Sequence, residues 1–300
     1  MISALPVVKP SAAPADRLLG FPLSGVVTPM GTVAYRESGH AAGPVTHVLL
    51  HGIGSASSSW LMQLEAVGGD GKVRMLAWDA PGYGGSDALP MDVPTAADYG
   101  QRLWIWLDTL QSQGCSTSSP ITLVGHSLGC LMAASAARQA PNRIKNLVLL
   151  SPAQGYARAT AGERAQKLKE RLDNLAQLGP DGMALRRGAA MLSPGATFEQ
   201  VAFVQSTMAQ IDPAGYTQAV HLLIRGDLLT DLTALNCPVT VASGSADTVT
   251  PPAACRAAAM HIGASYTSIA GAGHACAIEA PDEVTRLIGL SALTEKKRVE

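Results

Sequence analysis

The sequence has no excess of charge of either sign. Its 300 residues include 22 lysines and arginines against 23 aspartates and glutamates, which gives a formal net charge of −1. This balance offers no electrostatic footprint for nucleic acid or for an anionic membrane surface, so we expect neither as a partner. Charged residues make up only 15% of the chain and hydrophobic residues 47%, a composition that indicates a well-buried core and not disorder.

Long apolar runs and cysteine pairs are also missing. No window reaches the roughly 18 consecutive apolar residues of a membrane span, and residues 1–20 contain no apolar stretch typical of a secretory signal. The five cysteines are odd in number and show no C-x-x-C spacing, so neither a disulfide framework nor a structural zinc site is indicated. We expect a cytoplasmic protein without metal or cofactor.

What the chain does contain is a repeated alternation of apolar runs and helical patterns. After a hairpin over 26–38, six buried strands are predicted at 45–50, 73–78, 121–124, 144–150, 238–242 and 265–269. Helices are predicted over 95–113, from 129 to 140, over 252–261 and over 281–290. This order favours an α/β fold with a mostly parallel sheet and helices on both faces.

The alternation stops between residues 153 and 236. Leucines at helical spacing run from Leu168 to Leu178, and Thr197 with Gln200 forms a capping box for a second helix. We therefore divide the chain into an α/β core, residues 1–152 and 237–300, and an inserted helical cap, residues 153–236. The cap is predicted to be a lid over the carboxyl edge of the sheet; the alternative is a helical subdomain without a gating role.

The strongest chemical signal follows the predicted strand 121–124. There Gly125-His126-Ser127-Leu128-Gly129 separates the strand from an alanine-rich helix. Strand, glycine turn and helix are the context of a nucleophile elbow, in which the glycines relieve crowding and the central serine is held in a strained conformation at a helix N-terminus. The alternative is a serine that only caps the helix. We predict Ser127 as a nucleophile.

A serine nucleophile needs a positioned base, and the base needs an orienting acid. His274 follows the last predicted strand in a glycine-rich loop, and Asp247 lies in the loop after 238–242. With Ser127 they give the chain order serine, acid, histidine of an elbow-type triad. The remaining downstream histidines and acids of the insertion and helix ends have simpler structural explanations: His221, His261, Asp227 and Asp231.

An acyl-transfer intermediate also needs two backbone N–H donors for its oxyanion. Leu128, directly after the serine, supplies one, and Ile53 in the strand-end loop His51-Gly52-Ile53-Gly54 is predicted to supply the other. His51 is interpreted as holding this loop. His126 is expected to point to the opposite side of the turn, with a structural role.

Taken together, these motifs resemble the α/β-hydrolase superfamily from about residue 25 to 290. The matching stretches are His51-Gly-Ile-Gly54, Asp79-Ala-Pro-Gly-Tyr-Gly-Gly-Ser86, Gly125-His-Ser-Leu-Gly129, Asp247 and Gly273-His274. Asp212-Pro-Ala-Gly-Tyr216, Asp231-Leu and Thr250-Pro-Pro252 are similar to stretches of capped bacterial 3-oxoadipate enol-lactonases, whereas His126 and Cys130 depart from that group. A serine at 127 argues against the epoxide and haloalkane hydrolases, whose nucleophile is an aspartate.

The resemblance implies a serine hydrolase that cleaves a small carboxylic ester or lactone through an acyl-enzyme. Two alternatives remain open: hydrolysis of a C–C bond in a meta-cleavage product, and a ligand receptor built on a hydrolase scaffold. Arg186 and Arg187 are candidates for binding a substrate carboxylate, with a solvated pair as the alternative. The oligomeric state is left open.

Overall fold

The computed structural model describes residues 13–67, 72–233 and 235–291. Its centre is a sheet with the strand order β1-β2-β4-β3-β5-β6-β7-β8. The strands are β1 Ser24–Thr28, β2 Gly31–Gly39, β3 Val45–Leu50, β4 Arg74–Trp78, β5 Thr117–His126, β6 Ile144–Leu150, β7 Val239–Gly244 and β8 Ser265–Ile269. The β1–β2 and β2–β4 pairs are antiparallel, and every other pair is parallel. The predicted α/β fold with a mostly parallel sheet is confirmed, and the predicted hairpin is β1 with β2.

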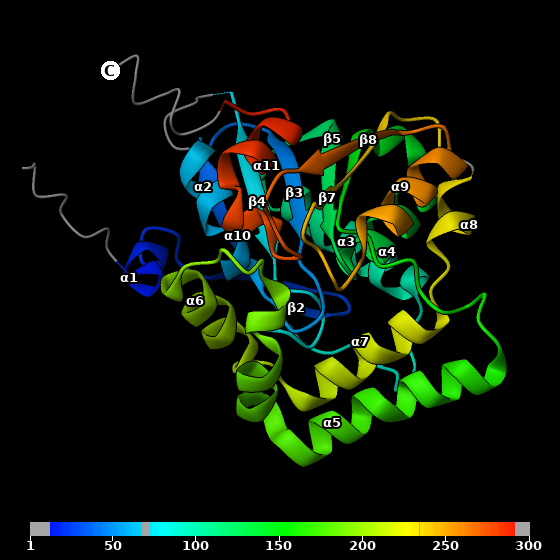
Figure 1. The fold of residues 1–300 in the computed structure, drawn as a ribbon. Helices are drawn as coiled ribbons and strands as arrows, with labels where there is room; N and C mark the ends of the chain where they lie inside the picture. Colours follow the sequence, from blue (N-terminus) through cyan, green and yellow to red (C-terminus); the bar gives the residue numbers. More distant parts are fainter. Residues whose placement is uncertain (1–12, 68–71, 234, 292–300) are drawn as a thin grey trace, which may run out of the picture.

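Helices cover both faces of this sheet (Figure 1). They are α1 Pro14–Leu18, α2 Leu61–Val67, α3 Ala96–Ser112, α4 Gly129–Gln139, α9 Pro252–His261, α10 Cys276–Glu279 and α11 Pro281–Leu287. Successive residues of a strand point to opposite faces, so a strand covered twice is apolar along its length. In β3, Val48 and Leu50 pack with α3 and α4, whereas Leu49 between them packs with α2 and α11. The apolar strands of the sequence are therefore buried on both sides.

The segment between β6 and β7 is helical, as the loss of alternation predicts. It contains α5 Ala161–Arg187, α6 Phe198–Met208, α7 Pro213–Arg225 and α8 Leu228–Leu232, and none of its described residues is in a strand. The predicted capping box of Thr197 and Gln200 starts α6. In α5, Gly179 leaves the helical conformation with φ of 62° just before Pro180, so the helix is kinked there.

The helices of this segment fall into two groups. In Figure 1, α5 and α7 run side by side along the lower side of the molecule, with α6 next to them; we call α5, α6 and α7 the cap helices. The short α8 packs instead against α4. Residues of these three helices line cavities together with the loops after β3, β5, β7 and β8, so the helices lie at the carboxyl ends of the parallel strands. The division of the chain into a core and a cap stays a prediction, as does the gating role of the cap.

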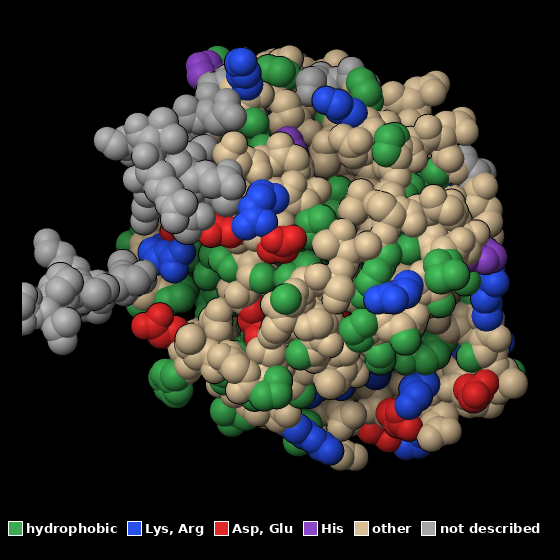
Figure 2. Space-filling view, turned by 45° about the horizontal axis from the view of Figure 1, so that its top comes forward, with side chains coloured by type: hydrophobic (Ala, Val, Ile, Leu, Met, Phe, Trp, Pro, Cys, Tyr) green, Lys and Arg blue, Asp and Glu red, His purple; other side chains and the backbone are tan. Residues whose placement is uncertain are grey.

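Two further properties of the described residues bear on possible partners. None of their helices is both long enough and apolar enough to span a membrane. On the face shown in Figure 2, acidic and basic side chains are scattered among polar and apolar ones and form no broad patch of one sign.

Candidate active site

Ser127 occupies a strained turn between β5 and α4. Its φ is 53°, a left-handed conformation that a residue with a side chain adopts only at a cost. Glycines on either side make the turn possible: a Cβ at Gly125 would lie 2.6 Å from the Gly129 carbonyl oxygen, and a Cβ at Gly129 would lie 2.3 Å from that of Leu50. The first turn of α4 can therefore approach the end of β3, and Ser127 is held at the carboxyl edge of the sheet. This is the geometry expected of a nucleophile elbow.

His274 and Asp247 meet at the same edge of the sheet. His274 Nδ1 lies 2.9 Å from Asp247 Oδ2, and the two residues are 4% and 3% exposed. Asp247 Oδ1 also accepts the backbone N–H groups of Val249 and Thr250, at 2.8 and 2.9 Å, and the Thr250 hydroxyl donates to Oδ2 at 2.8 Å. The carboxylate therefore has a donor at each of its oxygens.

These donors determine the charge of Asp247. Burial by itself would raise the pKa of the Asp247 carboxyl, but the hydrogen bonds from His274 and Thr250 outweigh burial and hold that pKa well below its ordinary range. Asp247 is thus ionised, and His274 donates to it from Nδ1. The tautomer fixed in this way leaves Nε2 of a neutral His274 as a proton acceptor.

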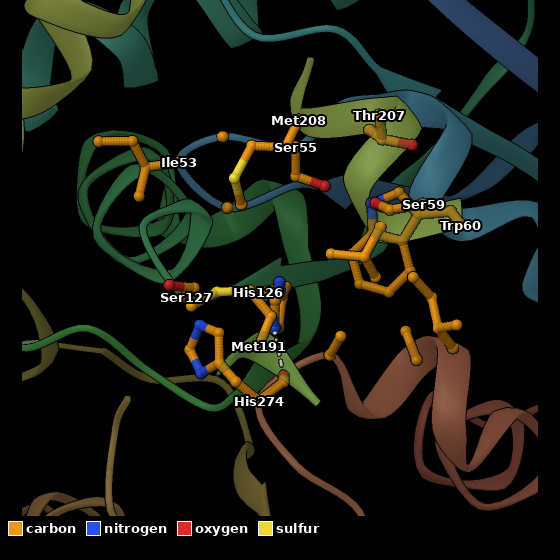
Figure 3. A pocket seen from close by; sticks show the side chains of 16 residues that line it. Ile53, Ser55, Ser59, Trp60, His126, Ser127, Met191, Thr207, Met208 and His274 are labelled. Atoms are coloured by element: carbon orange, nitrogen blue, oxygen red, sulfur yellow. Dashed lines mark hydrogen bonds between the residues drawn. The ribbon is translucent and has the colours of Figure 1, made fainter. Parts of the chain in front are cut away.

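The Ser127 hydroxyl and the His274 ring lie beside each other on the wall of two adjoining cavities (Figure 3). No hydrogen bond joins these two described side chains. In enzymes without substrate, catalytic hydrogen bonds are often long and tighten only when substrate binds.

The loop after β3 brings further backbone donors to Ser127. Gly52 allows the close approach, since a Cβ at this position would lie 2.9 Å from Ser127 Cβ. Ile53 and Leu128 both line the larger cavity, and neither backbone N–H has an acceptor among the described residues. The two predicted oxyanion donors therefore border the same space as Ser127.

His51 fixes the position of this loop, as the sequence suggests. Its Nε2 accepts the Ala80 backbone N–H at 2.9 Å, so Nδ1 carries the proton and donates to the Gly52 carbonyl at 2.8 Å. Burial lowers the pKa of His51, which favours this neutral form. Asp79, beside Ala80, accepts the Ser57 backbone N–H at 2.8 Å and anchors the far end of the loop.

The expected orientation of His126 is wrong. Its ring does not point away from the site but lines the smaller cavity, 4.9 Å from the His274 ring between centroids. The reason is the reversal of the backbone at Ser127, which leaves His126 on the side of the sheet where Trp60 packs edge-on against it. Nε2 donates to the His274 backbone carbonyl at 2.8 Å, the bond dashed in Figure 3. Burial, with a contribution from His274, lowers the pKa of His126 to about 3.

Two cavities of different character meet at Ser127. The smaller has a volume of about 50 Å³ and a mostly apolar lining. The larger has a volume of about 300 Å³, at the lower end of the range for small-molecule sites. Among the described residues that line it, the arginines Arg171 and Arg187 carry a permanent charge, and no acid is present. No group of three or more metal-ligating side chains occurs among the described residues.

Comparison with known proteins is decisive for the family. Residues 48–287 match the model of the alpha/beta hydrolase family. The chain belongs to this family. Among curated proteins, this hydrolase is 26% identical over 205 residues to (E)-2-((N-methylformamido)methylene)succinate hydrolase of Acinetobacter baylyi. The matched region covers 67% of this chain and 72% of that protein.

Solved structures of other family members have the same fold. A thermophilic esterase from Thermogutta terrifontis, solved with malate bound, has a TM-score of 0.76 and 22% identity, and the match covers 92% of this hydrolase and 98% of the esterase. The enol-lactonase from Burkholderia xenovorans LB400 has a TM-score of 0.67 and 23% identity, with 88% and 98% covered. The enzyme therefore shares its architecture with esterases and a lactonase.

The structure brings together Ser127, Asp247 and His274 and keeps the other candidates of this hydrolase elsewhere. Asp227 caps α8, Asp231 pairs with Arg138, His221 lies on α7 and His261 ends α9. Of the arginine pair, Arg187 lines the larger cavity and Arg186 is exposed. Sequence reasoning missed Arg171 and the donor role of Thr250. The resemblance of Thr250-Pro-Pro252 to lactonase stretches was the signal for the second.

Proposed function

We propose that this hydrolase cleaves a small carboxylic ester or lactone with Ser127 as nucleophile, His274 as general base and Asp247 as the orienting acid. The observation that carries the proposal is the ionised, fully hydrogen-bonded Asp247 on Nδ1 of His274, beside a strained Ser127 that faces a cavity. A serine hydroxyl alone is a weak nucleophile at neutral pH, and this arrangement supplies the base that it needs.

The reaction proceeds in two halves. Nε2 of His274 takes the Ser127 proton as Oγ attacks the substrate carbonyl carbon, and the negative charge moves to the carbonyl oxygen. When the intermediate collapses, the bond to the leaving oxygen breaks, that oxygen takes the proton from His274, and an acyl-serine remains. Water then attacks the acyl carbon, again giving its proton to His274, and the acid is released as Ser127 regains the proton.

The surrounding groups stabilise the charges formed on this path. The backbone N–H groups of Ile53 and Leu128 are assigned to the oxyanion, since both border the cavity without an internal acceptor. Asp247 stabilises the imidazolium of His274 in each half. The names of the relatives add support: one acts on a substituted methylenesuccinate, one is an esterase and one is an enol-lactonase.

A hydrolysis screen tests this proposal. Esters, lactones and ring-fission dienoates are offered to the wild type and to Ser127→Ala, and an activated fluorophosphonate is used to label the serine. We expect ester or lactone hydrolysis that Ser127→Ala abolishes, and labelling at Ser127 alone. Cleavage of dienoates without ester hydrolysis favours the C–C hydrolase. An unlabelled Ser127 and no hydrolysis above the variant's background overturn the catalytic proposal and favour a receptor.

A further inference from the structure

The larger cavity beside Ser127 is positively charged. Arg171 and Arg187, both on the cap helix α5, line it together with Ser127 and His274, and no described residue of its lining is an acid. The two arginines are sixteen positions apart and reach the same space because α5 is kinked at Gly179 and Pro180. The cap thus directs two like charges toward the candidate active site.

These two guanidinium groups have no acidic partner among the described residues, whereas half of the other described arginines do. Six described arginines form ion pairs with acids: Arg17, Arg74, Arg138, Arg143, Arg158 and Arg286. Arg171 and Arg187 have neither a hydrogen bond nor an ion pair with any described residue. Glu170, the acid next to Arg171, is exposed and is already bonded to Lys167 and Gln166.

Leaving the pair without an anion is unfavourable. Burial lowers the pKa of Arg187, and the like charge of Arg171 lowers it further. A partly buried charge without a partner costs free energy that an anion in the cavity would offset. A guanidinium group matches the geometry of a carboxylate, to which it donates two parallel hydrogen bonds.

A tyrosine hydroxyl in the same cavity is also available to a polar ligand group. Tyr216 of α7 lines the same cavity and is only 2% exposed. Its hydroxyl forms no hydrogen bond with a described residue and, unlike the fully buried hydroxyls of Tyr83 and Tyr99, is accessible from the cavity. An oxygen-rich ligand group in this cavity would supply the acceptor.

We infer that Arg171 and Arg187 bind a carboxylate group of the substrate, so that the preferred ester or lactone is an anion with its carboxylate in the larger cavity. This inference rests on the proposed function, because it places the scissile carbonyl at Ser127. The smaller apolar cavity then receives an uncharged substituent. The arginine pair makes the enzyme selective for acid-bearing substrates over neutral ones of the same length.

Two esters of matched length test the selectivity. Monoethyl succinate carries a carboxylate where ethyl butyrate carries a methyl group. We expect the wild type to show a higher kcat/KM for the succinate ester. Arg187→Gln should lower that value about 10- to 100-fold, the range for a lost charge-assisted hydrogen bond, while the value for ethyl butyrate changes less than about 3-fold. Arg171→Gln should lower kcat/KM for the succinate ester in the same way, so the test does not depend on the correct folding of a single variant.

Arg186→Gln is the matched control, because Arg186 is the exposed neighbour of Arg187 on the same helix. It should leave both esters unaffected. Equal hydrolysis of the two esters by the wild type, or equal effects of Arg186→Gln and Arg187→Gln, overturns the inference and leaves the serine hydrolase intact.

Binding measured without turnover separates the two proposals. In Ser127→Ala, succinate should bind and raise the thermal midpoint, and adding Arg187→Gln should remove that shift. If neither ester is hydrolysed, the proposed function fails, and the succinate shift still decides whether the arginine pair binds a carboxylate. If succinate does not raise the thermal midpoint, or if it raises it equally with and without Arg187→Gln, the arginine pair does not bind a carboxylate.

Discussion

His126 Nε2 donates a hydrogen bond to the backbone carbonyl of His274, at 2.8 Å. The residue before the candidate nucleophile therefore holds the loop that carries the candidate base. His274 is thus fixed twice, through its side chain by Asp247 and through its backbone by His126.

We predict that His126→Phe lowers kcat about 5- to 15-fold, because it keeps an aromatic ring against Trp60 but removes the donor to His274. Since burial lowers the pKa of His126 to about 3, the donor is neutral at every pH from 6 to 8, and the loss should be the same across that range. Steady-state kinetics at several pH values measure this. His261→Phe, at the exposed end of α9, is the control, and an unchanged kcat in His126→Phe would remove the positioning role.

A second prediction concerns Thr250. Its hydroxyl has a single proton, and the shortest of its contacts is to Asp247 Oδ2, at 2.8 Å, with the Ser151 carbonyl at 3.1 Å and His274 Nδ1 at 3.2 Å. Thr250→Val keeps the shape but removes this donor, so the Asp247 pKa should rise and kcat/KM should fall about 10-fold. Thr250→Ser restores the hydroxyl and should recover most of the activity. If the valine and serine variants behave alike, the hydroxyl has no part in the reaction.

The positions of the triad residues follow from the order of motifs along the chain, whereas their supporting contacts do not. A parallel sheet collects the loops after its strands at one edge, so Ser127, Asp247 and His274 were expected to meet there. The glycine turn predicts the strained conformation of Ser127, whose φ is 53°, but the pattern does not say on which side of the turn the neighbouring His126 ring packs. A side chain one residue from a strained turn is therefore beyond pattern reasoning.

The cap illustrates the same limit. The helical spacing of its apolar residues is sufficient to predict α5 and α6. The kink at Gly179, however, changes the direction in which the side chains after it point. Arg171 and Arg187 consequently share a cavity although a straight helix gives no reason to pair them. The strand β5 is also longer than predicted, at Thr117–His126 instead of 121–124, because the polar residues before Ile121 hide its beginning.

The close packing of the elbow leads to a prediction on folding. In Gly129→Ala the new Cβ would lie 2.3 Å from the Leu50 carbonyl oxygen, so α4 must shift and carry Ser127 with it. We expect a loss of at least about 2 kcal/mol in the free energy of unfolding, with little remaining activity. Gly162→Ala in α5, where nothing lies within 4 Å of the new Cβ, should instead stabilise the protein by about 0.5–1 kcal/mol. Urea titrations measure both, and similar stabilities of the two variants would contradict the packing argument.

The last prediction is a dependence of stability on pH that arises at Asp247. Its folded-state pKa lies below its ordinary range, so the unfolded chain binds a proton more readily than the native protein does. The stabilisation is therefore fully present above the unfolded value of about 4 and is lost as the pH falls toward the folded-state pKa. Asp247→Asn lacks this contribution, and it should be less stable than the wild type at pH 7.

The difference in the free energy of unfolding between the wild type and Asp247→Asn should narrow as the solution is acidified from pH 5 to pH 3. Urea unfolding of both at matched pH values measures it. The control for the loss of activity is Asp227→Asn at neutral pH, which removes a partly exposed acid at the start of α8. This variant should keep its turnover. A constant difference between wild type and Asp247→Asn from pH 7 to pH 3 would show that Asp247 is not the ionised partner of His274, and the orienting role would then fall with it.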